Sequence, residues 1–231
     1  MDEARLSPRP DADWPADPYP GARPAGSWVH LDGLVHPLRP GPWAVAGTPL
    51  DAWLTARGAP EVASREPVLA YGSNACPSKV ALLRREGLDG PVVVLRCTTT
   101  GVAAVWCAHP RVRDDQLPAV LVGAPARVEE HALWLATPDQ RAVLDACEGR
   151  GVRYRLAELA PPVVVRTEDG TVVPRPLAYV TGSAARAPLL HRGRVVPLTD
   201  VDQAGARRLV AGGARAAPWR PDDALPTGRG S

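Results

Sequence analysis

The fold of this chain is decided by one stretch of sequence, Val68-Leu69-Ala70-Tyr71-Gly72-Ser73-Asn74-Ala75-Cys76-Pro77. An apolar run stops there at a Gly-Ser-Asn turn and then meets a proline, which predicts a strand, a tight loop and the start of a helix. Gly72 permits a positive φ and a close backbone approach, and Ser73 and Asn74 are favoured N-cap residues. Pro77 suits the first turn of a helix, which we expect over residues 77–86.

Such a loop directs free backbone N–H groups to one point at the positive end of a helix dipole. That point favours a carboxylate or a developing oxyanion. An ordinary strand-to-helix turn has the same local pattern. The loop alone therefore leaves a binding role and a purely structural role both open.

A second motif lies downstream and reads Leu144-Asp145-Ala146-Cys147-Glu148-Gly149, followed by Tyr154-Arg155. The residues before it, Thr137-Pro138-Asp139-Gln140, form a capping box with proline at the first helical position. Gly149 is a helix stop signal. These signals predict a helix with Glu148 at its C-terminus.

The two motifs, in this order and at this separation, resemble the signatures of the γ-glutamylcyclotransferase-like family. The resemblance spans about residues 67–182. It implies an α+β fold, with a small mixed β-barrel and packed helices. It also implies an enzyme that cleaves a γ-glutamyl amine or amide by intramolecular cyclisation to 5-oxoproline, a small-molecule reaction that needs no cofactor.

The resemblance makes Glu148 the candidate catalytic residue, a general acid/base that takes a proton from the substrate α-ammonium and returns it to the leaving amine. At the negative end of its helix dipole and partly buried, its ionised form is disfavoured, which raises the expected pKa. The substrate-binding residues are expected to be Tyr71, Gly72, Ser73 and Asn74, through their backbone amides, and Tyr154, which resembles the family's tyrosine after the glutamate.

Two other functions remain open from the sequence. A binding module for a carboxylate would keep the loop without turnover. A thiol-dependent amide hydrolase would use Cys76 near a helix N-terminus, with His109 or His131 as base. Asp145 is expected to be a solvated helix residue rather than a catalytic partner of Glu148.

Arg150 and Arg153 follow Glu148 closely. Each could bind a substrate carboxylate through two parallel hydrogen bonds or could simply be solvated, and we favour solvation.

Composition narrows the class of protein further. The 231 residues carry a formal net charge of only +2, which argues against nucleic acid or a membrane as partner. There is no 18-residue apolar run and no secretory signal pattern, and neither the cysteines nor the histidines have ligand-type spacing. These features predict a cytoplasmic protein without a metal site.

The chain divides into three expected parts. Residues 1–66 are a covering segment that begins with a Pro-rich arm, extended or disordered over about residues 1–26, in which Trp14 and Tyr19 leave room for docking. Residues 67–182 form the family-like domain, whose short apolar runs after one helix predict an antiparallel sheet or barrel. Residues 183–231 hold a last helix, over about residues 200–211, and a tail.

Overall fold

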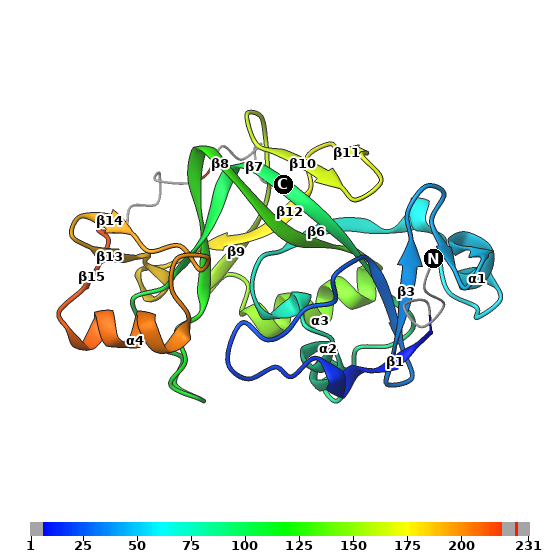
Figure 1. The fold of residues 1–231 in the computed structure, drawn as a ribbon, viewed down its shortest axis with the longest axis horizontal. Helices are drawn as coiled ribbons and strands as arrows, with labels where there is room; N and C mark the ends of the chain where they lie inside the picture. Colours follow the sequence, from blue (N-terminus) through cyan, green and yellow to red (C-terminus); the bar gives the residue numbers. More distant parts are fainter. Residues whose placement is uncertain (1–6, 219–224, 226–231) are drawn as a thin grey trace.

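The computed structural model describes residues 7–218 and Leu225, and among these residues it has a mixed α+β fold. Two long antiparallel strands, β7 (Val92–Trp106) and β8 (Ala119–Ala136), cross the centre of the molecule (Figure 1). Side chains of β7 are buried along nearly the whole strand, whereas β8 is buried at its two ends and largely exposed or half-buried over residues 122–130. The pair bends at a bulge between Thr100 and Gly101.

The main sheet has twelve strands among the described residues. Its continuous path is β5 (Thr48–Pro49), β4 (Ala44–Val45), β3 (Leu34–Arg39), β2 (Trp28–Leu31), β7, β8, β6 (Glu66–Ala70), β12 (Leu177–Thr181) and β9 (Tyr154–Glu158). Off this path, β1 (Arg9–Pro10) pairs with β3, and β10 (Val164–Thr167) pairs with β7 and with β11 (Val172–Val173). The β6–β12 pair is parallel.

The predicted closure into a barrel is wrong, since the sheet ends at β5 and β9. Closing the inner strands would require β9 to pair with the outer edge of β7. That edge is already taken, because β2 pairs with it over Val92–Val94 and β10 over Cys97–Thr100. The sheet therefore stays open. Strands from the N-terminal segment cover one part of the edge.

Helices pack against both clusters of buried side chains. Helices α2 (Pro77–Arg84) and α3 (Pro138–Glu148) pack on one face, where Val80, Leu83 and Leu144 join a buried cluster around Trp134. Helices α1 (Leu50–Thr55) and α4 (Gln203–Ala211) pack against the other cluster. A small second sheet lies beside α4 and contains β13 (Leu189–His191), β14 (Arg194–Val195) and β15 (Arg215–Ala216) (Figure 1). Short 3-10 helices are Asp11–Asp13, Val62–Ser64, Ser73–Ala75 and Ala184–Arg186.

The helix end that carries Glu148 is as predicted. Thr137 and Gln140 form the capping box at the start of α3. At the other end Gly149 adopts φ 64°, a left-handed conformation that glycine accepts without strain. No helix among the described residues is long and apolar enough to span a membrane.

The loop between β6 and α2 differs in detail from its prediction. A 3-10 turn over Ser73–Ala75 precedes α2, so that the N-cap residue is Cys76 rather than Ser73 or Asn74. Gly72 has φ −110°, so a positive φ is not what requires glycine. Close approach does require it, because a Cβ on Gly72 would lie 2.5 Å from the Tyr19 hydroxyl oxygen.

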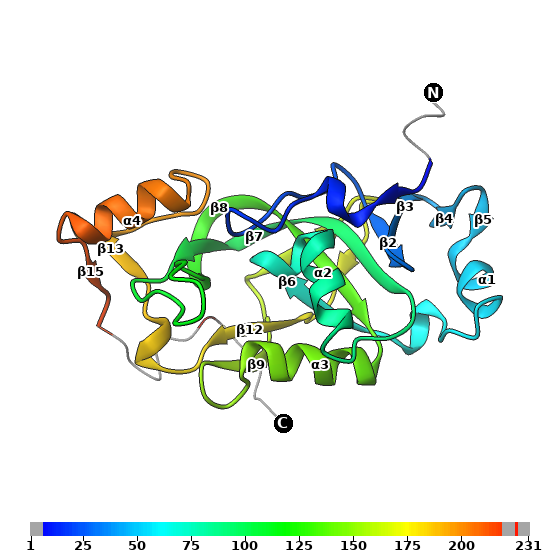
Figure 2. The same ribbon diagram turned by 90° about the horizontal axis from the view of Figure 1, so that it is seen from below.

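The N-terminal arm, residues 7–26, lies along the folded domain. Figure 2 shows it, in dark blue, passing across α2 and β7. Tyr19 is only 5% exposed and packs against Trp106, with the ring centroids 6.0 Å apart. The Cys76 thiol donates to the Trp14 carbonyl at 3.2 Å. The sequence leaves open whether Trp14 and Tyr19 dock on the domain, and the structure shows that they do. The three-part domain division stays a prediction.

Candidate functional site

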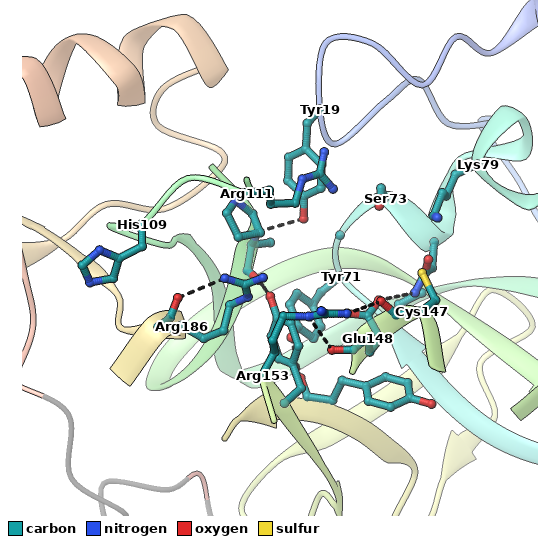
Figure 3. A pocket seen from close by; sticks show the side chains of 18 of the residues that line it. Tyr19, Tyr71, Ser73, Lys79, His109, Arg111, Cys147, Glu148, Arg153 and Arg186 are labelled. Atoms are coloured by element: carbon teal, nitrogen blue, oxygen red, sulfur yellow. Dashed lines mark hydrogen bonds between the residues drawn. The ribbon is translucent and has the colours of Figure 1, made fainter. Parts of the chain in front are cut away.

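A cavity of about 480 Å³ opens where β6 runs into its loop and α3 ends. All six predicted site residues line it: Tyr71, Gly72, Ser73, Asn74, Glu148 and Tyr154. Figure 3 shows Ser73, Tyr71 and Glu148 grouped on the same part of the wall. The fold therefore brings together two motifs that lie far apart in the sequence.

A direct hydrogen bond joins the two motifs. The Asn74 side-chain amide donates to Glu148 Oε1 at 2.8 Å. The backbone of Asn74 is held by the sheet, since the indole N–H of Trp134 donates to the Asn74 backbone carbonyl at 2.8 Å. The carboxyl group is thus aimed by a buried side chain that the sheet fixes in place.

The environment of Glu148 shifts its titration toward neutral pH. Glu148 is half-buried and lines the cavity. The loss of water around its carboxyl group raises its pKa. The Asn74 hydrogen bond and the positive charges of Lys79, Arg153 and Arg186 oppose this rise. Glu148 is the one carboxylate among the described residues that line the cavity.

Arg153 holds the helix end beneath Glu148. Its guanidinium donates to the carbonyls of Cys147, at 2.8 Å, and Glu148, at 3.2 Å. These are carbonyls that the last turn of a helix leaves without partners. Arg153 is therefore engaged by the protein, and Arg150 pairs with Asp145 at 3.0 Å on the exposed surface.

The loop offers backbone donors. Its 3-10 turn starts at Ser73, so the N–H groups of Ser73 and Asn74 have no partner within the turn. The carbonyls on the preceding residues are fixed by the arm, because Arg23 Nη2 donates to Tyr71 O at 3.1 Å and to Gly72 O at 3.2 Å. In a trans peptide the N–H points away from the C=O. The N–H groups of Gly72 and Ser73, which belong to these two peptides, therefore point away from Arg23.

The hydroxyls of Tyr71 and Tyr154 in the wall donate to backbone carbonyls. Tyr71 donates to the carbonyl of Tyr179, and Tyr154 donates to that of Ala119 at 2.9 Å. Burial raises the pKa of both phenols, so both stay protonated. For the predicted contact of Tyr154 with substrate, only the lone pairs of its oxygen and the face of its ring remain.

The residues of the thiol alternative are not brought together. Cys76 does not line the cavity, and burial raises the pKa of its thiol, which disfavours the reactive thiolate. His131 is buried beside Glu129, at 3.3 Å, whereas His109 lies in the cavity wall. Asp145 turns toward Arg141, Arg150 and Tyr179 and is not a second carboxylate for Glu148.

Sequence reasoning did not assign to the site several polar residues of the wall, among them Tyr19, Lys79, Arg111 and Arg186. Lys79 had a signal, since it stands at the third position of a helix whose start faces the predicted site. The others come from the arm, from the loop after β7 and from the turn after β12, where no local motif marks a site. No group of three or more potential metal-ligating side chains occurs among the described residues.

No protein-family model and no curated protein matches the sequence. Three of the solved structures that do match are similar in fold at low identity. An uncharacterized protein from Homo sapiens is 12% identical, over 69% of this chain and 93% of that one, with a TM-score of 0.43. A γ-glutamyl cyclotransferase is 12% identical, over 67% and 90%, with a TM-score of 0.41. A protein from Arabidopsis thaliana is 16% identical, over 64% and 78%, also with 0.41. At these scores the argument about activity rests on the cavity.

Proposed function

We propose that the protein cleaves a γ-glutamyl amine or amide by intramolecular cyclisation and releases 5-oxoproline and a free amine. The observation that carries the proposal is the hydrogen bond from Asn74 to Glu148 inside the cavity. This bond joins the one carboxylate among the described lining residues to a loop that has backbone donors. The cavity volume of about 480 Å³ suits a small molecule.

Glu148 would act first as base and then as acid. Its carboxylate takes a proton from the α-ammonium of the glutamyl group, and the resulting amine attacks the γ-carbonyl carbon. A new C–N bond closes the five-membered ring. When the γ-amide C–N bond breaks, Glu148 returns its proton to the leaving nitrogen. The ring nitrogen loses its second proton as it becomes an amide, and the leaving amine takes up that proton and departs as the ammonium ion. No water or other co-reactant is consumed, and burial shifts the pKa of the carboxyl upward, in the direction that favours both transfers.

The loop would stabilise charge at two places. The amides of Gly72, Ser73 and Asn74 are donors for the substrate α-carboxylate or for the oxyanion that forms at the γ-carbonyl. Loss of one such donor typically slows a reaction about 10²–10³-fold. Because nucleophile and carbonyl belong to one molecule, holding the ring-forming conformer supplies much of the remaining acceleration.

The raised pKa of Glu148 favours an enzyme over a binding module. A module that only binds a carboxylate gains nothing from a second, half-buried carboxyl group facing the ligand. The thiol-dependent hydrolase is supported by no contact of Cys76 with the cavity. We therefore advance cyclisation alone.

The test is mass spectrometry of a panel of γ-glutamyl compounds incubated with the protein. We expect 5-oxoproline from at least one compound. We also expect Glu148→Gln to lower kcat at least about 10²-fold, because the amide is nearly isosteric but takes no proton. Cys76→Ser is the control and should keep most of the activity. Near wild-type turnover by Glu148→Gln would refute the mechanism, and loss in Cys76→Ser alone would favour the thiol hydrolase.

The Glu148→Gln variant should remain folded. A group whose pKa is raised in the folded state contributes stability below its unfolded pKa, and that contribution is lost as the pH rises through the folded value. At pH 8 the buried carboxylate is therefore unfavourable to folding. We expect Glu148→Gln to melt at or above the wild-type temperature, so a loss of turnover would not reflect unfolding.

A further inference from the structure

Arg186 is a buried guanidinium in the cavity wall. It ends the 3-10 helix Ala184–Arg186 after β12 and is 8% exposed. Its Nη1 donates to the neighbouring Ala185 carbonyl at 3.0 Å, while Nε is buried and has no hydrogen-bond partner among the described residues. The guanidinium carbon lies 5.4 Å from the ring centroid of Tyr154. Within the described part of the chain, no carboxylate forms an ion pair with it.

Other arginines of this chain show how a buried guanidinium is ordinarily satisfied. Arg23, Arg65 and Arg84 do not line the cavity. Each donates to at least two backbone carbonyls, which are those of Tyr71 and Gly72 for Arg23, of Pro60, Pro91 and Leu135 for Arg65, and of His30, Leu88 and Gly90 for Arg84. Arg65 also has one buried nitrogen, Nη2, without a partner among the described residues, but its other nitrogens donate to three carbonyls. The Arg186 guanidinium donates to one carbonyl, that of its own neighbour. Burial raises the pKa of the Cys107 thiol, and the positive charge of Arg186 opposes this rise. Arg186 differs from the other three in lining the cavity and in donating to a single carbonyl.

A buried charge is costly unless a counter-charge or hydrogen bonds compensate for it. The planar guanidinium fork matches a carboxylate or a phosphate, which it binds through two parallel hydrogen bonds. Glu148 is the one carboxylate among the described lining residues. It is near enough for the charge of Arg186 to oppose the rise that burial causes in its pKa, but it accepts a hydrogen bond from Asn74 and forms no ion pair with Arg186. The described residues thus leave the fork of Arg186 without an anion, which a ligand in the cavity could supply.

The position of Arg186 shows which part of a ligand would reach it. In Figure 3, Ser73 and Lys79 lie on one side of the cavity, Arg186 and His109 lie on the other, and Glu148 is between them. With the glutamyl group on the loop amides and its γ-carbonyl near Glu148, the leaving amine extends toward Arg186.

We propose that Arg186 binds an anionic group, a carboxylate or a phosphate, on the amine half of the substrate and thereby sets the substrate class. This inference rests on the proposed function. It assigns the two anions of such a substrate to different donors, the α-carboxylate to the loop and the second anion to Arg186. The expected substrates are γ-glutamyl derivatives of amino acids or of amino phosphates rather than of neutral or cationic amines.

The experiment compares three substrates that differ in one terminal group: γ-glutamylglycine, γ-glutamylglycinamide and γ-glutamylaminomethylphosphonate. We expect the wild-type protein to have a kcat/KM about 10- to 100-fold higher for one or both of the anionic compounds than for the neutral amide, as one charge-assisted contact provides. The better of the two anions tells whether carboxylate or phosphate is preferred.

Arg186→Gln should bring this ratio close to one, mainly through KM. Arg186→Lys should keep part of the preference, because it keeps the charge but not the fork. Arg150→Gln is the matched control, an exposed arginine outside the cavity, and should leave the ratio unchanged. A wild-type protein that prefers the neutral amide, or an Arg186→Gln variant with the wild-type ratio, would overturn the proposal.

A binding measurement separates this inference from the proposed function. Calorimetric titration of the Glu148→Gln protein with γ-glutamylglycine and its amide gives the same ratio without turnover. If no compound yields 5-oxoproline but the acid still binds more tightly than the amide, and Arg186→Gln removes the difference, cyclisation is wrong and the anion site stands. Equal binding of acid and amide rejects the anion site.

Discussion

The cavity has two walls of different origin. The inner wall consists of the Tyr71–Asn74 loop and the end of α3, whose residues bond to each other through Asn74 and Glu148. The outer wall consists of Tyr19 from the N-terminal arm and residues 109–113 after β7, where Arg111 lies over the Tyr19 ring at 4.8 Å. The inner wall holds the groups proposed for chemistry. The outer wall holds the inner loop in shape and closes the space around it.

Two truncations test this division most strongly. A chain that starts at Pro67 loses β2, the partner of β7, and buried side chains such as Trp28, Leu50 and Leu54. Each is worth about 1.5–3 kcal/mol or more against a typical stability of about 5–15 kcal/mol, so this chain should unfold or aggregate. A chain that starts at Ser27 loses only the arm. It should still melt cooperatively, with kcat/KM lowered about 10²-fold because Tyr19 and Arg23 no longer shape the site.

Thermal melts and the 5-oxoproline assay measure both outcomes. A soluble Pro67 chain that melts like the full protein would make residues 27–66 an appendage. Full activity of the Ser27 chain would show that the arm is not needed to hold the inner wall in its active shape.

The same division separates what the sequence predicted from what it did not. The strand, the proline at the start of α2, the capping box of Thr137 and the stop at Gly149 depend on neighbours within a few residues, and all are where local rules place them. The prediction of a closed barrel failed because closure depends on which strand pairs with the edge of β7. The strands that pair there, β2 and β10, come from distant segments, and no local sequence pattern indicates this pairing.

The site follows the same rule. The local signals predict Glu148 at a helix end, and the resemblance to the family names Glu148 and Asn74 as site residues, but the hydrogen bond between their side chains is a finding of the structure. Tyr19 and Arg186 were not assigned to the site, because each lies in the wall only through packing between distant segments. For Gly72, the predicted positive φ is wrong and the predicted close approach is right, but the group that approaches is the Tyr19 hydroxyl, which no local pattern indicates.

Gly72 and Tyr19 allow the contact between the walls to be measured. Gly72→Ala would place a Cβ 2.5 Å from the Tyr19 oxygen, which accepts the Ala119 N–H at 2.8 Å and is therefore not free to move. We expect a loss of about 1–3 kcal/mol in unfolding free energy. Tyr19→Phe removes that oxygen, so the alanine should cost about 1 kcal/mol less in the Tyr19→Phe background.

The comparison is a double-mutant cycle from denaturant unfolding. Gly123→Ala is the control glycine, since its Cβ would meet nothing closer than 4.0 Å, and it should add independently to Tyr19→Phe. Additivity of Gly72→Ala and Tyr19→Phe within about 0.5 kcal/mol would mean that the walls do not press on each other there.

The smallest expected effect is a shift in pH dependence within the inner wall. If Glu148 must be ionised to act as base, kcat/KM rises with pH through its raised pKa. Asn74→Ala removes a hydrogen bond that lowers this pKa, so the rise should move to higher pH. Asn74→Asp puts a second carboxyl beside Glu148 and should move it further in the same direction.

Rate profiles of the three proteins on one substrate decide the point. A shift to lower pH, or no shift in either variant, would mean that another group controls the profile. Tyr19→Phe serves as the control from the outer wall, because its effect should be on stability rather than on the position of the acid limb.

Lys79 is the single lysine in the sequence, and it lines the cavity with 4% of its surface exposed. No other ε-amine on the chain competes with it for reagents that acylate or reductively alkylate amines. A small aldehyde or activated ester that enters the cavity therefore tags one internal peptide, which digestion separates from a tag on the α-amine of the chain. The fraction of protein labelled at Lys79 then measures the fraction of molecules whose cavity is empty. Any compound that fills the space lowers it, whether or not the compound is a substrate.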